Sequence, residues 1–142
     1  MLKIGDKFLF EENLLNRQTC LMFFKEYNSV SWSVDIGFKN GNFGDEILAP
    51  AICINPINTD KNSIEDLVGE IFRVATVEEC DDREDTFYLY ESEPMVSYEL
   101  EVLEIKDSRA HVRCNGILIV DGYSVPYIRE SFEIDAWIPV IE

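Results

Sequence analysis

The residue types in this chain that could do acid–base, nucleophilic or metal chemistry are its single histidine, its carboxylates and its thiols. His111 lies in the stretch R-A-H-V-R-C, whose alternation predicts a strand with the imidazole pointing outward. A turn at Asp107-Ser108 would place Glu104 opposite His111, so we expect a surface ion pair between them. Because no recognisable motif places a serine or cysteine nucleophile beside the histidine, we expect no catalytic residue here.

The cysteines give little support for a metal site. Cys20, Cys53, Cys80 and Cys114 are widely spaced, without a C-x-x-C pair, so neither a zinc site nor a disulfide framework is indicated. Residues 60–62, D-K-N, lack the turn glycine and terminal glutamate of a calcium loop. Phosphate-binding glycine motifs and the G-x-S-x-G motif are also absent. The sequence predicts reduced structural thiols, no metal and no cofactor.

Carboxylates are concentrated in the middle of the chain. Residues 65–107 hold 15 acidic residues against three basic ones, so 12 of the 16 net negative charges fall there. The densest segment, E-E-C-D-D-R-E-D, contains Glu78, Glu79, Asp81, Asp82, Glu84 and Asp85. Such density predicts either a solvated loop between two strands or a surface that attracts a cationic partner. The same net charge disfavours direct binding to nucleic acid.

A second candidate surface lies near the C-terminus, in S-F-E-I-D-A-W-I-P-V. Its alternation predicts an inward apolar set and leaves Glu133, Asp135 and Trp137 pointing outward. An outward tryptophan between carboxylates is typical of a hot spot for a basic, partly apolar partner. The alternative is that the N-terminal segment covers this face and makes Trp137 part of the core. Further aromatic contacts are expected from Tyr88, Tyr90, Tyr98, Tyr123 and Tyr127.

The elements that must position these residues are mostly strands. Clean alternation predicts a half-buried strand at residues 29–38 with Trp32 in the core, and a continuous apolar run predicts a central strand at 20–24. Further strands are expected at 47–54, ended by Pro56, and at 70–77, 86–90, 97–105, 109–114, 117–120 and 127–140. The dipeptides Asn40-Gly41, Asn115-Gly116 and Asp121-Gly122 predict hairpin turns.

Helices are expected to be few and short. One is predicted from a cap at Asn62 or Ser63 to Gly69, and another at residues 11–17. The length predicts a single domain, residues 1–142. The expected fold class is α+β, predominantly antiparallel β, as a curved sheet or β-sandwich with one or two short helices. Charges interrupt the N-terminal apolar residues and no run is long enough to span a membrane, so a cytoplasmic protein is expected.

With its small size, extreme acidity, predicted β-rich domain and the strands S-W-S-V-D-I-G-F and S-F-E-I-D-A-W-I-P-V, the chain resembles bacterial immunity proteins. These belong to polymorphic-toxin and contact-dependent growth-inhibition systems. The resemblance is one of overall character over most of the chain, and no motif carries over a functional residue. It implies a cytosolic antidote that binds the C-terminal domain of a cognate toxin, often a basic nuclease, and blocks its active site or substrate groove.

We therefore expect a protein-binding role and no enzymatic activity. The expected contacts are a first patch of Glu78, Glu79, Asp81, Asp82, Glu84 and Asp85 and a second of Glu133, Asp135 and Trp137. One alternative is a nucleic-acid-mimicking inhibitor of another DNA-handling protein, and another is a structural oligomer subunit. A third is a small hydrolase that pairs Glu99 or Glu101 with Glu130 or Glu133. A concave pocket with two converging carboxylates would indicate the hydrolase, and a flat or convex acidic face the inhibitor.

Overall fold

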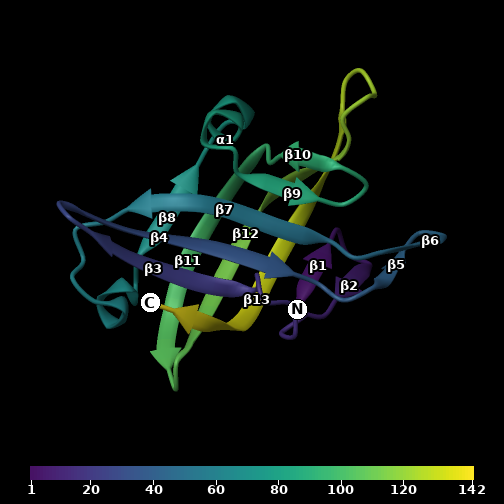
Figure 1. Cartoon of the computed structure of the whole chain (residues 1–142). Helices are drawn as coiled ribbons and strands as arrows, with labels where there is room; N and C mark the ends of the chain where they lie inside the picture. The colour runs from purple at the N-terminus through teal and green to yellow at the C-terminus, as the bar shows by residue number, and fades with distance from the viewer.

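The computed structural model describes residues 1–142, and 60% of them lie in strands and 8% in helices. Figure 1 shows the strands wrapped into one strongly curled sheet, a half-barrel. Of the two expected arrangements, the curved sheet is therefore confirmed. The strands are β1 (Leu2–Ile4), β2 (Phe8–Phe10), β3 (Cys20–Glu26), β4 (Ser29–Gly37), β5 (Gly41–Phe43), β6 (Glu46–Leu48), β7 (Ala51–Asn58), β8 (Ile71–Val74), β9 (Thr86–Tyr88), β10 (Ser92–Pro94), β11 (Ser97–Lys106), β12 (Arg109–Asp121) and β13 (Ile128–Ile141).

The last strand, β13, organises the sheet. The strand order is β10-β9-β7-β4-β3-β13-β12-β11-β8, with β1 and β2 attached beside β13 and a separate β5–β6 hairpin. One edge of β13 pairs with β12 over nearly its whole length. Its other edge pairs first with β1, where Leu2 lies opposite Ile134, and later with β3, where Val140 lies opposite Leu21. Two different strands thus share one edge, and β13 bends between them (Figure 1).

The core lies inside the curl, where β3, β4 and β7 cross in front of β11, β12 and β13 (Figure 1). The alternation predicted for residues 29–38 is confirmed, because Trp32, Val34 and Ile36 are buried. The rings of Phe87 and Phe132 meet across the interior with centroids 5.1 Å apart. Burial of apolar side chains from both walls of the curl supplies the main driving force for this fold.

Two of the three predicted glycine turns are wrong. Asn115-Gly116 lies inside β12, where a Cβ on Gly116 would collide with the carbonyl oxygen of Ser97 on β11. The glycine is therefore needed for a close approach of two strands. Asn40-Gly41 leads into β5, whose hairpin turns at Gly44-Asp45 instead. Asp121-Gly122 does begin the connection from β12 to β13. The turn at Asp107-Ser108 is confirmed, and both residues have positive φ.

The prolines interrupt the sheet differently from the prediction. Pro50 separates β6 from β7, so residues 47–54 do not form one strand. Pro56 does not end β7, which continues to Asn58. The pairing of β4 with β7 shifts register there, because Trp32 lies opposite Ile57 and Val34 opposite Ile54. One residue of β4 therefore faces two of β7, and this bulge accommodates a proline that cannot donate a ladder hydrogen bond.

The helices also differ from the prediction. A 3₁₀ helix, η1 (Ile64–Leu67), occupies the predicted 62–69 segment, but residues 11–17 form turns and an isolated bridge from Glu12 to Phe38. The α-helix of the structure, α1 (Val77–Arg83), occupies most of the acidic segment, for which a solvated loop was one of the two expectations, and it starts at residue 77, the predicted end of the strand at 70–77. No helix in the structure is long and apolar enough to cross a membrane.

Candidate protein-interaction surface at helix α1

The local sequence around α1 explains why a helix forms in the acidic segment. Thr76 is its N-cap, and its side-chain oxygen accepts a hydrogen bond from the Glu79 backbone N–H at 3.2 Å. Glu78 and Glu79 place negative charge in the first turn, where it interacts favourably with the helix dipole and stabilises the helix. The helix ends at Glu84, whose φ of 60° is left-handed and whose N–H reaches back to the carbonyl groups of the last turn. The N-cap residue Thr76 and the C-cap residue Glu84 thus mark a helix that the sequence analysis did not predict.

The acidic segment divides into an outer and an inner set. The outer set is exposed, and we call it the helix patch: Glu78, Glu79, Asp81, Asp82 and Glu84. The inner set contains Cys80, which is buried, and Asp85, whose exposed fraction is 0%. The prediction that Asp85 shares the outer surface is therefore wrong, because the chain turns inward after Glu84.

Asp85 is the centre of a buried hydrogen-bond network. Its Oδ2 accepts from Arg83 Nε at 2.7 Å and from the Tyr98 hydroxyl, and its Oδ1 accepts from the Asn55 backbone N–H at 2.8 Å. Arg83 also donates from Nη2 to the Asn55 carbonyl at 2.7 Å, and its guanidinium lies 4.7 Å above the ring of Phe72. A buried carboxylate is tolerated only with such partners. We call Asn55, Arg83, Asp85 and Tyr98 the Asp85 network.

The Asp85 network ties α1 to both walls of the curled sheet. Asn55 belongs to β7 and Tyr98 to β11, and four strands, β4, β3, β13 and β12, lie between these two in the strand order. Burial, together with the hydrogen bond to Asp85, raises the pKa of Tyr98 far above its usual range. The network therefore holds α1 in a fixed position against the sheet.

The helix patch carries negative charge that the protein itself does not neutralise. None of its five carboxylates forms an ion pair, although six ion pairs exist elsewhere in the structure. Figure 1 shows α1 standing out from one end of the half-barrel. Carboxylates at this spacing on one short helix repel one another, and a cationic surface docked against them would remove that repulsion.

In the second predicted patch, Glu133, Asp135 and Trp137 on β13, Asp135 has ion-pair partners and Glu133 has none. We call these three residues, together with the facing β12 residues His111 and Arg113, the strand patch. Its residues face outward as expected, but the Asp135 Oδ1 lies 2.6 Å from His111 Nε2 and Oδ2 lies 3.7 Å from Arg113 Nη2. The Trp137 ring stacks on His111 with centroids 4.9 Å apart. Strand pairing with β12 thus places His111 and Arg113 beside Asp135 of β13.

The environments of Trp137 and His111 agree only in part with the predictions made for these two residues. Trp137 is half-buried, so it is neither part of the core nor fully presented. The N-terminal segment does approach it: Met1 and Glu12 line a hollow beside Trp137, and the Met1 ammonium donates to the Asp135 carbonyl at 2.8 Å. Glu104 lies opposite His111 in the register as predicted, but the imidazole contacts Asp135 on the other neighbouring strand.

Two carboxylates considered for a hydrolase lie in one open groove of about 460 Å³ on the outer face of the sheet. Glu99 and Glu133 both line it, whereas Glu101 and Glu130 do not. In the register, Asn115 of β12 stands between Glu99 and Glu133, so the two are two strand spacings apart, about 10 Å. Glu99 also accepts a hydrogen bond from Arg73 Nε at 2.5 Å. The pairing with Arg73 favours a structural role for Glu99.

The thiols are placed as structural residues. All four cysteines are unpaired, and Cys20, Cys80 and Cys114 are buried. Burial raises the pKa of Cys80 to about 11, and burial and a hydrogen bond with Asp35 raise the pKa of Cys53 to about 12. A thiol with a raised pKa is a poor nucleophile at neutral pH. The structure contains no group of three or more His, Cys, Asp or Glu side chains placed to hold a metal ion.

The tyrosines are divided between the interior and the surface. Tyr98 is buried in the Asp85 network, so the expectation that it enriches the outer surface is wrong. Tyr88, Tyr90 and Tyr123 are exposed, and Tyr127 is half-exposed.

Comparison of the chain with protein-family models, with curated proteins and with solved structures gave no match.

Proposed function

We propose that this chain is an immunity protein that binds the C-terminal domain of a cognate toxin, a basic nuclease, and neutralises it. The observation that carries the proposal is the helix patch, whose five exposed carboxylates have no ion-pair partner within the protein. The resemblance in size, acidity and β-rich character to bacterial immunity proteins supports the same assignment.

The physical argument starts from what a nuclease must present. A nuclease binds phosphates through basic residues, so a dense carboxylate surface can dock in its substrate groove as a competing anion. Long-range attraction of this kind accelerates encounter and makes it dependent on ionic strength. Because the Asp85 network fixes α1, little conformational entropy is lost when the partner docks.

The helix patch is the primary contact in this proposal, and the strand patch is secondary. Asp135 already has His111 and Arg113 as partners, so a toxin would have to displace them to use its charge. Asp85 is left out of the contact because it is buried.

The test compares capture by three forms of the immobilised protein at about 50 and 500 mM salt, a range over which surface attraction is strongly screened. The forms are the wild type, a helix-patch variant and a control with the same change in net charge. The helix-patch variant carries Glu78→Gln, Glu79→Gln, Asp81→Asn, Asp82→Asn and Glu84→Gln. The control changes five exposed carboxylates elsewhere: Glu26→Gln, Asp45→Asn, Asp60→Asn, Asp66→Asn and Asp107→Asn.

We expect the wild type and the control to retain a basic toxin domain at low salt and the helix-patch variant to lose it. The captured domain is then assayed for nuclease activity, which the wild type should inhibit and the helix-patch variant should not. Equal capture by all three forms would remove the helix patch from the interface. Capture without inhibition of a toxic activity would contradict the immunity assignment. Inhibition of a non-toxin DNA-handling protein would establish the nucleic-acid-mimic alternative instead.

A further inference from the structure

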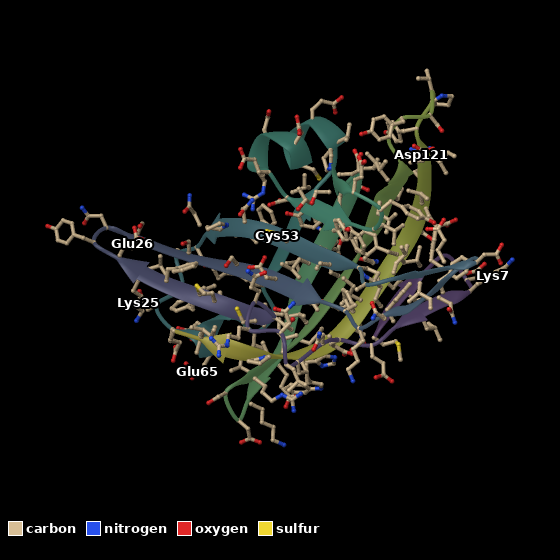
Figure 2. The ribbon with its side chains drawn as sticks, turned by 45° about the vertical axis from the view of Figure 1, so that its right-hand side comes forward. Lys7, Lys25, Glu26, Cys53, Glu65 and Asp121 are labelled. Atoms are coloured by element: carbon tan, nitrogen blue, oxygen red, sulfur yellow. The ribbon has the colours of Figure 1, made fainter.

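A pocket of about 260 Å³ lies between the β9–β10 turn and the connection from β12 to β13. Its lining includes two tyrosines, Tyr90 and Tyr123, and three carboxylates, Glu91, Glu93 and Asp121, and no basic residue. Figure 2 labels Asp121 at the base of the loop that projects from the same end of the molecule as α1. The pocket therefore lies at the end of the molecule from which α1 stands out.

The three carboxylates of this pocket are not equivalent. Asp121 accepts hydrogen bonds from the Tyr123 backbone N–H at 2.9 Å and from Ser124 Oγ at 2.8 Å, which fixes the loop. Glu91 accepts a hydrogen bond from the Tyr123 hydroxyl at 3.3 Å. Glu93 accepts none, and its carboxylate lies against Gly122, where an added Cβ would stand 2.6 Å from Oε1. Glu93, which is partly exposed, therefore has no donor within the protein that competes for its carboxylate.

The aromatic rings supply the second half of the site. Tyr123 is 80% exposed and Tyr90 is 41% exposed, so neither contributes to the core. The hydrogen bond to Glu91 and the charge of that carboxylate raise the pKa of the Tyr123 hydroxyl. A tyrosine face beside a carboxylate attracts a cation by both its ring quadrupole and the neighbouring charge.

We infer that this pocket binds the side chain of an arginine from the protein partner, with the guanidinium stacked on Tyr123 and paired with Glu93. A guanidinium is favoured over an ammonium because it is planar, stacks on aromatic faces and is more weakly hydrated, so it loses less on entering a half-open pocket. Its parallel N–H groups also match the two oxygens of a carboxylate.

The identity of the partner in this inference rests on the proposed function, whereas the chemistry of the pocket does not. Strand β10, which contains Glu93, contacts α1. A basic domain docked on the helix patch would therefore place arginine side chains near the pocket. One arginine inserted there would fix the orientation of a partner that the helix patch attracts only by long-range charge.

The test is an NMR titration of the wild-type protein with N-acetyl-arginine methylamide at constant ionic strength. Two probes of similar size serve as comparisons: the neutral citrulline analogue and the lysine analogue. We expect saturable shifts of the backbone amides of Glu91, Gly122 and Tyr123 with the arginine probe, in the millimolar range expected for a single side chain. The lysine probe should bind at least about twofold more weakly, and the citrulline probe should not bind.

Matched variants identify the residues responsible. Tyr123→Leu and Glu93→Gln should each weaken binding of the arginine probe by about two- to fivefold, the range of one exposed cation–aromatic or surface ionic contact. Tyr27→Leu is the control, because Tyr27 is 93% exposed in the β3–β4 turn and lies outside the pocket. Its affinity for the probe should match that of the wild type.

Several results would overturn the inference: no saturable shift, equal shifts with citrulline, equal affinity for the lysine probe, or no effect of Tyr123→Leu. The titration needs no toxin, so its failure is distinguishable from failure of the proposed function. If the probe does not bind while neutralising the helix patch still abolishes capture of the toxin, only the pocket inference falls. If the probe binds and no toxin is captured, only the immunity assignment falls.

Discussion

The helix patch and the strand patch look alike in the sequence and differ in the folded protein. Both place carboxylates on the surface, but Asp135 in the strand patch meets His111 and Arg113, whereas no cation meets the helix patch. The difference arises from secondary structure. Antiparallel pairing brings His111 and Arg113 of β12 beside Asp135 of β13, which is more than 20 residues away in the sequence, while a short acidic helix places its carboxylates mainly near one another. Unneutralised charge is therefore a property of the fold, and local composition does not reveal it.

The same contrast exists within the acidic segment itself. Asp82 and Asp85 are three residues apart, yet Asp82 is exposed and Asp85 is completely buried with three hydrogen-bond donors around it. We assign structure to the inner set and recognition to the outer set. If this division is right, substitutions in the two sets should affect different measurements.

The largest expected effect is that of Asp85→Ala. This change leaves Arg83, which is about three-quarters buried, and the buried Tyr98 hydroxyl without their main acceptor. Removing one partner of a buried ion pair costs about 3–5 kcal/mol. We expect the free energy of unfolding, measured by urea denaturation, to fall by that amount. The control Asp82→Ala should change it by less than about 0.5 kcal/mol. Equal effects of the two substitutions would contradict the division into inner and outer sets.

The Asp85 network should also make stability sensitive to alkaline pH. Because the folded pKa of Tyr98 is raised, the folded protein keeps this proton at a pH where the unfolded chain loses it. The contribution of Tyr98 to stability is therefore complete below about pH 10 and falls by about 1.4 kcal/mol per pH unit above it. The raised pKa values of Cys53 and Cys80 act in the same direction.

The substitution Tyr98→Phe isolates the contribution of this one hydroxyl. Urea midpoints measured at intervals from pH 9 to 11.5 should decline less steeply above pH 10 in the variant than in the wild type. Parallel declines in both proteins would show that Tyr98 is not held in its protonated form by the fold.

Much of the sheet could be predicted from the sequence because alternation is a local signal. The strand at residues 29–38, the C-terminal strand and the turn at Asp107-Ser108 were all indicated by the side chains of the strands themselves. Asn115-Gly116 failed because its glycine serves a contact with Ser97, which is distant in the sequence. The burial of Asp85 could not be predicted either, since its donors Asn55 and Tyr98 come from two strands that only the curled sheet brings together.

A smaller effect is expected at the start of α1. Thr76→Ala removes the side-chain acceptor of the Glu79 N–H and should lower the free energy of unfolding by about 1 kcal/mol. Thr76→Ser keeps a hydroxyl at this position and should restore most of the loss. Because the helix patch depends on α1, Thr76→Ala should also increase amide hydrogen exchange in residues 77–83. Unchanged exchange would show that the Asp85 network alone holds the helix.

The smallest expected effects differ in sign, and this makes them the sharpest comparison between the two patches. Asp135→Asn removes the charge that His111 and Arg113 share, so it should lower the free energy of unfolding by at most about 1 kcal/mol.

Asp81→Asn combined with Asp82→Asn relieves repulsion in the last turns of α1, where negative charge also opposes the helix dipole. This pair should raise the free energy of unfolding by a few tenths of a kcal/mol at low salt, and the gain should vanish at about 0.5 M salt, where charges are screened within a few ångströms. A loss of stability in both variants would mean that the helix patch is neutralised within the protein after all, and it would remove the reason to expect a cationic partner there.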